Sequence, residues 1–176
     1  MPAAIRAYAA ADLAACRRLW EVLTERHRLI YDDPSIGGDD VGLYFDTHLA
    51  RVGPENIWVA EEDGVVVGMS GLIVGDGEAE IEPVVVDEGR RSRGIGTLLL
   101  NEGVARARAL GVQYLNIAPV ARNSRAIEMF VRSGFRLIGH VQLFIELQGR
   151  PGRPARSPER LPQDLAKLTE MLAEWS

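Results

Sequence analysis

The 176-residue sequence has little of several residue types that define specialised classes of protein. Its single cysteine, Cys16, excludes a disulfide framework, and its three histidines lie too far apart in sequence for a recognisable metal-ligand spacing. No segment has the apolar length of a membrane span, and the N-terminus lacks the basic start and unbroken apolar stretch of a signal peptide. We therefore expect no disulfide, no metal, no membrane contact and a cytoplasmic location.

Charge is distributed unevenly along the chain. Residues 1–88 contain 6 Arg and 18 Asp or Glu, a net charge of −12, whereas residues 89–176 contain 13 Arg, one Lys and 7 acids, a net charge of +7. This asymmetry indicates either an anionic partner near the C-terminal half and a cationic one near the N-terminal half, or two solvated surfaces. The overall charge of −5 and the lack of interleaved aromatic and basic residues argue against nucleic acid as a ligand.

With 47% hydrophobic residues, the chain is long enough for one domain with its own core. Apolar periodicity and turn residues predict alternating strands and helices. The predicted elements are a strand over 3–8, a helix from Asp12, an irregular loop over 26–40, a helix near 41–49, a hairpin over 57–74 turning at Asp63-Gly64, a strand over 79–86, a helix over 98–110, a strand over 114–120, a helix over 124–133, and one or two strands over 135–147. The strand over 114–120 follows a helix, so we expect it to be parallel to the strand over 79–86.

The C-terminal tail differs in composition from the rest of the chain. Residues 1–148 are expected to form the domain, and residues 149–160 form a linker rich in Arg, Pro and Gly. Residues 161–176 are predicted to form an amphipathic helix with four leucines and Trp175 on one face. Such a short helix needs a surface for its apolar face, either on its own domain or on a second subunit of a homodimer. The arginines of the linker could contact nucleic acid, but such stretches are more often solvated linkers.

A basic, glycine-containing loop joins a predicted strand to a predicted helix. The segment Arg91–Gly96 (RSRGIG) stands where the first amides of a helix have no partner and the helix dipole favours negative charge. Gly94 and Gly96 allow close approach of the backbone, Arg91 and Arg93 can add charge-assisted bonds, and Thr97 can add a hydroxyl. A pyrophosphate fits this loop, although a plain tight turn would explain the two glycines alone. Two other phosphate loops are excluded, because the first lysine is Lys167 and residue 99, where a dinucleotide fingerprint needs glycine, is leucine.

A second motif follows at Asn123–Phe135 (NSRAIEMFVRSGF). Together the two motifs resemble those of the GNAT superfamily of N-acetyltransferases. Arg91–Gly96 is similar to its acyl-CoA loop, in which Arg or Gln is followed by two residues, Gly, one residue, and Gly or Ala. Asn123–Phe135 is similar to the family's helix with Asn, Ala, Tyr and Gly-Phe at fixed spacing. The resemblance covers roughly Ile5 to Leu147 and is strongest from Ile81 to Phe135.

The resemblance implies a fold and a site for acetyl-CoA. The implied fold is α/β (α+β), with a mixed, mostly antiparallel central sheet of six to seven strands, a splayed parallel pair and flanking helices. Acetyl-CoA would lie where strand 81–86 splays from strand 114–118, and Pro83, which lacks a ladder donor, suits a bulge or the start of the splay. The residues implied to contact the cofactor are Val84 and Val86 through their backbone, Arg91, Ser92, Arg93, Gly94, Ile95, Gly96 and Thr97 around the pyrophosphate, and Asn123 and Phe130. Asn123 can equally be a helix N-cap, and both roles can hold together.

Amide formation needs a base, because an alkyl amine with a pKa near 10 is mostly protonated at neutral pH. Glu80 and Glu82 are two residues apart on a predicted strand, so both project from one face. The resemblance favours Glu80 as the base and makes Glu82 the second candidate. Two carboxylates facing solvent on an antiparallel sheet would explain the same pattern.

One position departs from the family pattern. Where the family commonly has a tyrosine that can protonate the departing CoA sulfur, the sequence has Phe130, which has no hydroxyl. Three alternatives follow: the thiolate leaves unaided or through water, another group such as Tyr31 or Tyr44 supplies the proton, or catalysis has been lost.

The acceptor side is indicated by acids in and around the loop over 26–40, which would attract a cationic amine or could simply be solvated. The candidate acceptor-binding residues are His27, Tyr31, Asp32 and Tyr44. The sequence thus predicts an N-acetyltransferase that moves an acetyl group from acetyl-CoA to a primary amine of a small molecule or peptide by direct attack. The alternative is a catalytically silent acyl-CoA-binding or sensor module.

Overall fold

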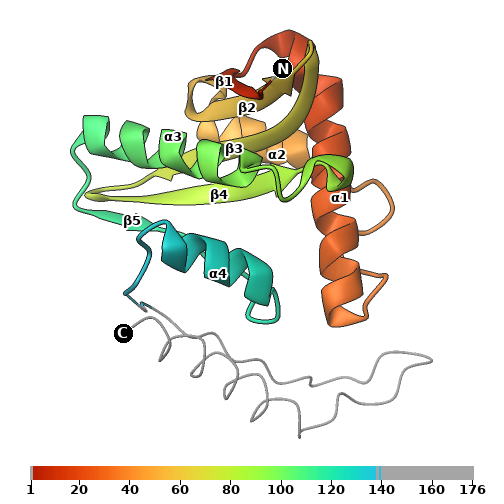
Figure 1. Ribbon diagram of the computed structural model, residues 1–176. Helices are drawn as coiled ribbons and strands as arrows, with labels where there is room; N and C mark the ends of the chain where they lie inside the picture. The colour runs from red at the N-terminus through yellow and green to blue at the C-terminus, as the bar shows by residue number, and fades with distance from the viewer. Residues whose placement is uncertain (1, 138, 140–176) are drawn as a thin grey trace, which may run out of the picture. The chain divides into compact units, whose positions relative to one another are not determined.

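The computed structural model describes residues 2–137 and 139, and the chain divides into two units, residues 1–118 and 119–176. The first unit is built on a sheet with the strand order β1-β2-β3-β4-β5 (Figure 1). Its elements are β1 (Ala4–Ala7), the 3-10 helix η1 (Ala10–Asp12), α1 (Leu13–Tyr31), α2 (Leu43–Val52), η2 (Pro54–Asn56), β2 (Ile57–Glu62), β3 (Val65–Val74), β4 (Glu78–Val86), η3 (Glu88–Arg90), α3 (Ile95–Leu110) and β5 (Tyr114–Asn116).

The sheet is mixed, as predicted. Strands β1 to β4 pair antiparallel in sequence order, and β5 pairs parallel with β4 after the α3 crossover. The described residues contain five strands in this sheet rather than the six to seven expected. The missing strands were expected over 135–147, where residues 135–137 and 139 are not strand and the remainder lies outside the described residues.

The hairpin between β2 and β3 turns at the predicted dipeptide. Asp63 and Gly64 both have positive φ angles, 53° and 77°. A two-residue turn with both central residues in the left-handed region matches the twist of the flanking strands. This turn fixes which residues of β2 and β3 face each side of the sheet.

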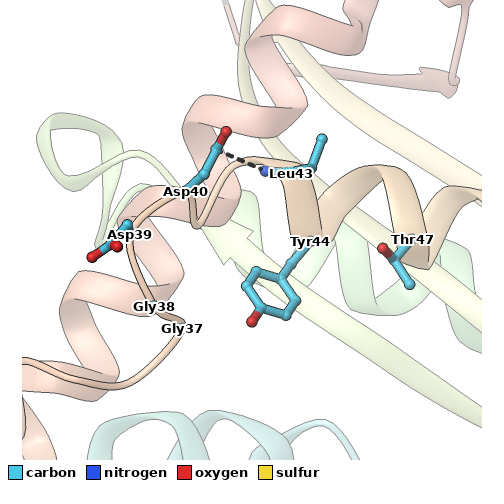
Figure 2. Close-up of a pocket in the computed structure, with 7 residues that line it drawn as sticks. All are labelled: Gly37, Gly38, Asp39, Asp40, Leu43, Tyr44 and Thr47. Carbon is cyan, nitrogen blue, oxygen red and sulfur yellow. Dashed lines mark hydrogen bonds between the residues drawn. The ribbon is translucent and has the colours of Figure 1, made fainter.

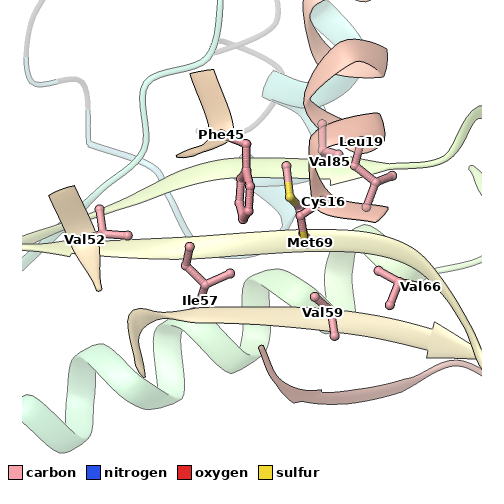
Figure 3. Close-up of a cluster of buried hydrophobic side chains, with 9 residues drawn as sticks. All are labelled: Cys16, Leu19, Phe45, Val52, Ile57, Val59, Val66, Met69 and Val85. Atoms are coloured by element: carbon pink, nitrogen blue, oxygen red, sulfur yellow. The ribbon is translucent and has the colours of Figure 1, made fainter. Parts of the chain in front are cut away.

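Helices cover both faces of the sheet in the first unit. Helices α1 and α2 pack on one face through Cys16, Leu19 and Phe45, and the buried cluster they form with the strands is shown in Figure 3. The nine members of this cluster are Cys16, Leu19, Phe45, Val52, Ile57, Val59, Val66, Met69 and Val85. Helix α3 covers the opposite face, where the indole N–H of Trp58 donates to the Leu99 carbonyl oxygen at 2.9 Å. Burial of apolar surface on both faces stabilises the sheet from which β4 presents its side chains.

The close approach of α3 depends on a glycine within the helix. A Cβ atom at Gly103 would lie 2.7 Å from the Ile81 side chain and 3.0 Å from the Trp58 ring. Gly111 ends α3 with a φ of 70°, as the sequence predicted.

Helix α1 is longer than the sequence predicted. Residues 26–31, expected to be part of an irregular loop, continue α1 to Tyr31. The segment RHRLIY contains no helix breaker, so the chain leaves the helix only at Asp32, which has a left-handed φ of 51°. The loop that remains before α2 is therefore residues 32–42.

The second unit contains helix α4 (Ser124–Arg132) among its described residues. The Asn123 side chain accepts from the Ala126 N–H at 3.4 Å, so it occupies the predicted N-cap position. Gly134, after the helix, has a φ of 104°. The predicted linker over 149–160 and helix over 161–176 lie outside the described residues. No described helix combines the length and apolar character that a bilayer span requires.

Candidate active site

Two glutamates project from the middle of β4 toward α2. Glu80 and Glu82 lie two residues apart on one strand face, and the Arg51 guanidinium of α2 is 3.7 Å from the Glu82 carboxylate. Burial raises the pKa of Glu80 most, and the negative charge of Glu82 raises it further. The positive charge of Arg51 lowers the same pKa. A half-buried carboxylate with a raised pKa is suited to accept a proton near neutral pH.

The β4–β5 pairing ends beside these glutamates. It covers only Glu78–Glu80 against Tyr114–Asn116, so within the first unit the rest of β4 has a neighbouring strand on one side only. The Asp87 N–H donates to the Val67 carbonyl oxygen of β3 at 2.9 Å. Along a strand, the backbone N–H and C=O groups of successive residues point to opposite neighbours. The N–H and C=O groups of Val84 and Val86 therefore point away from β3, toward the edge that β5 leaves uncovered.

The strand bulges next to Glu82. The β3–β4 register shifts between Ser70 and Leu72, which places the single residue Gly71 opposite Glu82-Pro83. A Cβ atom at Gly71 would lie 2.7 Å from the Glu82 carbonyl oxygen, so only glycine fits here without a shift of the backbone. The bulge agrees with the interpretation of Pro83 from the sequence.

A buried histidine lies against this bulge. His48 of α2 is 5% exposed, and its Nε2 atom lies 3.2 Å from the position of a Gly71 Cβ. The Nε2 atom has no hydrogen-bond partner within normal geometric limits among the described residues, and its ring packs against Trp20 with centroids 5.1 Å apart. The pKa of His48 is lowered to about 4, mainly by burial and secondly by the positive charge of Arg51. The imidazole is therefore neutral at pH 7.

The predicted anion loop leads into the N-terminus of α3. The first helical bond runs from the Leu98 N–H to the Gly94 carbonyl oxygen, so the amides of Ile95, Gly96 and Thr97 precede it. Gly94 has a φ of 81°, and no heavy atom lies within 4 Å of the position its Cβ would take. Three helix-entry amides beside an open space can bind a small anion.

Both arginines of the segment Arg91–Gly96, and Arg90 directly before it, are paired with carboxylates; these three are called the loop arginines below. Arg90 and Arg93 both bind Glu62, at 3.0 Å and 2.8 Å. Arg91 binds Glu88 at 2.9 Å, and its Nε atom donates to the Val86 carbonyl oxygen at 3.2 Å. The arginines that were expected to bind an anion thus form ion pairs with carboxylates of the protein itself.

A surface pocket lies on the loop before α2 and on the exposed side of that helix (Figure 2). Its lining residues are Gly37, Gly38, Asp39, Asp40, Leu43, Tyr44 and Thr47. Of the four candidate acceptor residues, Tyr44 lines this pocket, whereas His27 and Tyr31 belong to α1 and Asp32 follows it. The Asp40 carboxylate accepts from the Leu43 N–H at 3.3 Å and so helps to begin α2. The exposed Asp39 is therefore the pocket acid more available to a ligand.

Two neighbouring acids have structural roles. Asp33 is 2% exposed and accepts from the Ser35 N–H and hydroxyl, at 3.0 Å and 2.6 Å. Asp46 forms an ion pair with Arg17, which joins α2 to α1. Neither carboxylate lines the pocket, so the acidity of the loop in the sequence overstates the charge available to a ligand.

Asn123 and Phe130 belong to the second unit. Asn123 caps α4, and Phe130 is 7% exposed with its ring centroid 6.5 Å from that of Phe135. The structure confirms the helix that carries this motif. The part these residues take in a site with the first unit remains a prediction.

Sequence reasoning missed Glu62, His48 and Arg51. A signal existed for Glu62, because Trp58, Ala60 and Glu62 alternate along β2 and place a carboxylate on the covered face of the sheet. No local pattern indicated His48 or Arg51, whose positions depend on how α2 packs against β3 and β4.

Comparison with known proteins supports the family assignment of the two motifs. The sequence profile of the acetyltransferase (GNAT) family matches residues 10–135. The mycothiol acetyltransferase of Propionibacterium freudenreichii is 29% identical over 108 residues, and that of Clavibacter michiganensis is 33% identical over 76 residues. These alignments cover 58% and 43% of this chain but 33% and 25% of the relatives, so the chain spans about a third or less of their length. A crystal structure of a GNAT-family acetyltransferase from Staphylococcus aureus Mu50 is similar with a TM-score of 0.65 at 17% identity, covering 84% of this chain and 95% of that one.

The profile match spans more than half of the chain, so the chain belongs to the GNAT family of acetyltransferases. This confirms the family predicted from Arg91–Gly96 and Asn123–Phe135. It also confirms the prediction of an enzyme of the acetyl-transferring class. The likeness to the solved structure independently supports the fold.

Proposed function

We propose that the protein transfers an acetyl group from acetyl-CoA to a primary amine by direct attack, with Glu80 as the base and Glu82 as its partner. The observation that carries this proposal is the placement of Glu80 at the last paired residue of the β4–β5 ladder. Burial and Glu82 raise its pKa, which improves its match to proton transfer near neutral pH. A base at the point where two strands separate can meet a substrate lying between them.

The chain has features that fit acetyl-CoA. The outward-facing N–H and C=O groups of Val84 and the N–H of Val86 can pair with the amides of the pantetheine arm, as an added strand would. The Val86 carbonyl oxygen already accepts from the Arg91 Nε atom. The α3-entry amides from Ile95 to Thr97 can bind the diphosphate, and Gly94 leaves room for it. Arg91 and Arg93 would join them only by exchanging their present carboxylate partners.

The proposed step conserves atoms and protons. The amine nitrogen attacks the thioester carbonyl carbon, the new C–N bond forms, and the C–S bond breaks to release the CoA thiolate. Glu80 receives the proton that the amine loses, directly or through water. The thiolate needs no acid to leave, because a thiol pKa near 8.5 makes it a good leaving group; this suits a protein with Phe130 in place of tyrosine.

The pocket beside α2 supports a cationic acceptor. Asp39 supplies negative charge and Tyr44, 52% exposed, supplies an aromatic face, a combination that attracts ammonium groups. A small molecule or peptide with a second cationic group would suit it. The mycothiol acetyltransferases that resemble this chain are larger proteins.

Release of CoA thiol from acetyl-CoA, measured with a panel of primary amines, tests the proposal. The wild type should react with at least one amine, and Glu80→Gln should lower kcat by about 10²- to 10⁴-fold, the usual contribution of a general base. Glu78→Gln is the matched control, because Glu78 lies on the same strand, is exposed and bonds Asn116 at 3.0 Å. Binding of acetyl-CoA without reaction of any amine, together with no effect of Glu80→Gln or Glu82→Gln, would identify the silent module instead.

A further inference from the structure

A buried carboxylate at the end of β2 holds the loop that precedes α3. The Glu62 side chain is 3% exposed, and Arg93 binds it with both terminal nitrogens, at 3.2 Å and 2.8 Å. Arg90 adds a third contact at 3.0 Å. A desolvated carboxylate with three charge-assisted contacts is held in a narrow range of positions.

The two arginines lie on either side of a strongly turned backbone. Ser92 has a φ of 66° and Gly94 a φ of 81°, so the chain adopts left-handed conformations twice within three residues. Glu62 holds the side chains of Arg90 and Arg93, and so restrains the backbone before and after Ser92. The next residues are Ile95, Gly96 and Thr97, whose amides begin α3.

We infer that Glu62 is a positioning residue for the anion-binding loop. By holding Arg90 and Arg93, it keeps the α3-entry amides in the arrangement that binds the diphosphate, and it commits these two guanidinium groups to the protein rather than to the ligand. This inference rests on the proposed function, since it takes the anion to be the diphosphate of acetyl-CoA.

A different role for Glu62 makes the opposite prediction. If its carboxylate only competed with the diphosphate for Arg93, its removal would free a guanidinium and tighten CoA binding. If it positions the loop, its removal loosens the amides and weakens binding. The sign of the change in affinity therefore separates the two roles.

The test is the dissociation constant of CoA, measured by calorimetry for the wild type, Glu62→Gln and Glu61→Gln. Glu62→Gln should weaken binding about tenfold, the order expected for losing one charge-assisted hydrogen bond. Glu61→Gln is the matched control, because Glu61 is the adjacent residue of β2 and pairs with Arg6 at 2.7 Å, away from the loop. Unchanged or tighter binding by Glu62→Gln overturns the inference. No binding of CoA by the wild type overturns the proposed function itself.

A second variant keeps the inference testable if Glu62→Gln fails to fold. Arg93→Lys retains the positive charge but cannot form the two-pronged contact with Glu62. Positioning predicts about tenfold weaker CoA binding for Arg93→Lys, whereas retained affinity would show that Arg93 acts as a simple charge and overturn the inference. In kinetics, Glu62→Gln should raise KM for acetyl-CoA and leave KM for the amine unchanged. A general structural defect would raise both, and would equally count against positioning.

Discussion

At the level of single residues, the glutamates of β4 form a pair in which one carboxylate sets the ionisation of the other. Glu80 is raised in pKa by burial and by the charge of Glu82, and Arg51 opposes both effects. Arg51 is also the ion-pair partner of Glu82. Burial, Glu82 and Arg51 therefore determine together the pH at which Glu80 loses its proton.

We predict opposite shifts of the pH profile for changes at Glu82 and Arg51. Glu82→Gln removes a like charge, lowers the pKa of Glu80, and should move the acid limb of kcat to lower pH. Arg51→Gln removes an opposite charge and should move that limb to higher pH. The measurement is kcat at saturating substrates from pH 5 to 9, because this quantity reports groups in the bound complex. Loss of activity in Glu82→Gln at every pH, with an active Glu80→Gln, would make Glu82 the base.

His48 gives a second prediction, for stability. Its folded-state pKa of about 4 is below the value of 6.5 for free histidine, so between these pH values the unfolded chain binds a proton that the folded protein does not. Stability is therefore complete above pH 6.5 and falls as the pH drops toward 4, by at most about 3 kcal/mol from this residue.

Urea denaturation at pH 7 and pH 4.5 measures this effect. The loss of unfolding free energy between these pH values should be smaller in His48→Leu than in the wild type, because leucine does not titrate. His27→Leu is the comparison, since burial also lowers the pKa of His27 but the side chain is only partly buried. An equal pH dependence in the wild type and His48→Leu would show that His48 does not titrate as described.

At the level of elements, the bulge in β4 depends on the absence of a side chain in β3. Gly71 leaves space that the Glu82 carbonyl oxygen approaches, with His48 on the same side. We predict that Gly71→Ala will lower stability by about 1–3 kcal/mol, the usual cost of overpacking, and will also lower kcat because it displaces Glu82. Gly75→Ala is the control, as its nearest neighbour would be 3.5 Å away, an ordinary contact. Full activity in Gly71→Ala would show that the bulge does not position the glutamates.

Elements with strong local signals were predictable from the sequence. The hairpin followed from Asp63-Gly64 between apolar runs, and the end of α3 followed from Gly111. The extent of α1 was predicted less well, because a polar helical surface and a polar loop have similar composition until a residue such as Asp32 changes the backbone direction.

The site was predictable to the extent that it depends on strand alternation. That Glu80 and Glu82 share one face of the strand follows from the two-residue period of a strand. The pairing of the Val84 and Val86 backbone with the cofactor was implied by the family resemblance and stays a prediction. The contacts of Arg51 with Glu82 and of Glu62 with Arg93 were not predictable. They join residues 31 apart in sequence, and they depend on the packing of whole elements.

At the level of the whole chain, the charge asymmetry of the sequence is partly cancelled by folding. Glu62, in the acidic half, binds two arginines of the basic half, and Glu88, at the end of the acidic half, binds Arg91 at 2.9 Å. Formal charge counted along a sequence therefore overstates the field that a ligand meets. Among the described residues, acids outside such ion pairs are the better guide to a cationic substrate, and Asp39 of the pocket is one of them.

We predict that Asp39→Asn raises KM for a diamine acceptor several-fold, on the order of the loss of one attractive charge in a partly exposed pocket. The effect should diminish as salt is raised toward 1 M, where the screening length falls to about 3 Å. Asp76→Asn, in the turn between β3 and β4, changes the net charge equally and should leave KM unaltered. Equal effects of the two substitutions would indicate that net charge, and not the pocket, attracts the amine.

The pairing of all three loop arginines also affects how the protein behaves among polyanions in general. A loop with three unpaired guanidinium groups would be retained on heparin and would accumulate nucleic acid during purification. In this protein Arg90, Arg91 and Arg93 each contact a carboxylate, so the loop offers little unspecific attraction at a distance. We expect acetyl-CoA to be distinguished from other anions by direct contact, because the anion must reach the backbone amides at the N-terminus of α3. Replacing Arg90, Arg91 and Arg93 by glutamine should therefore change retention of the protein on a heparin column very little.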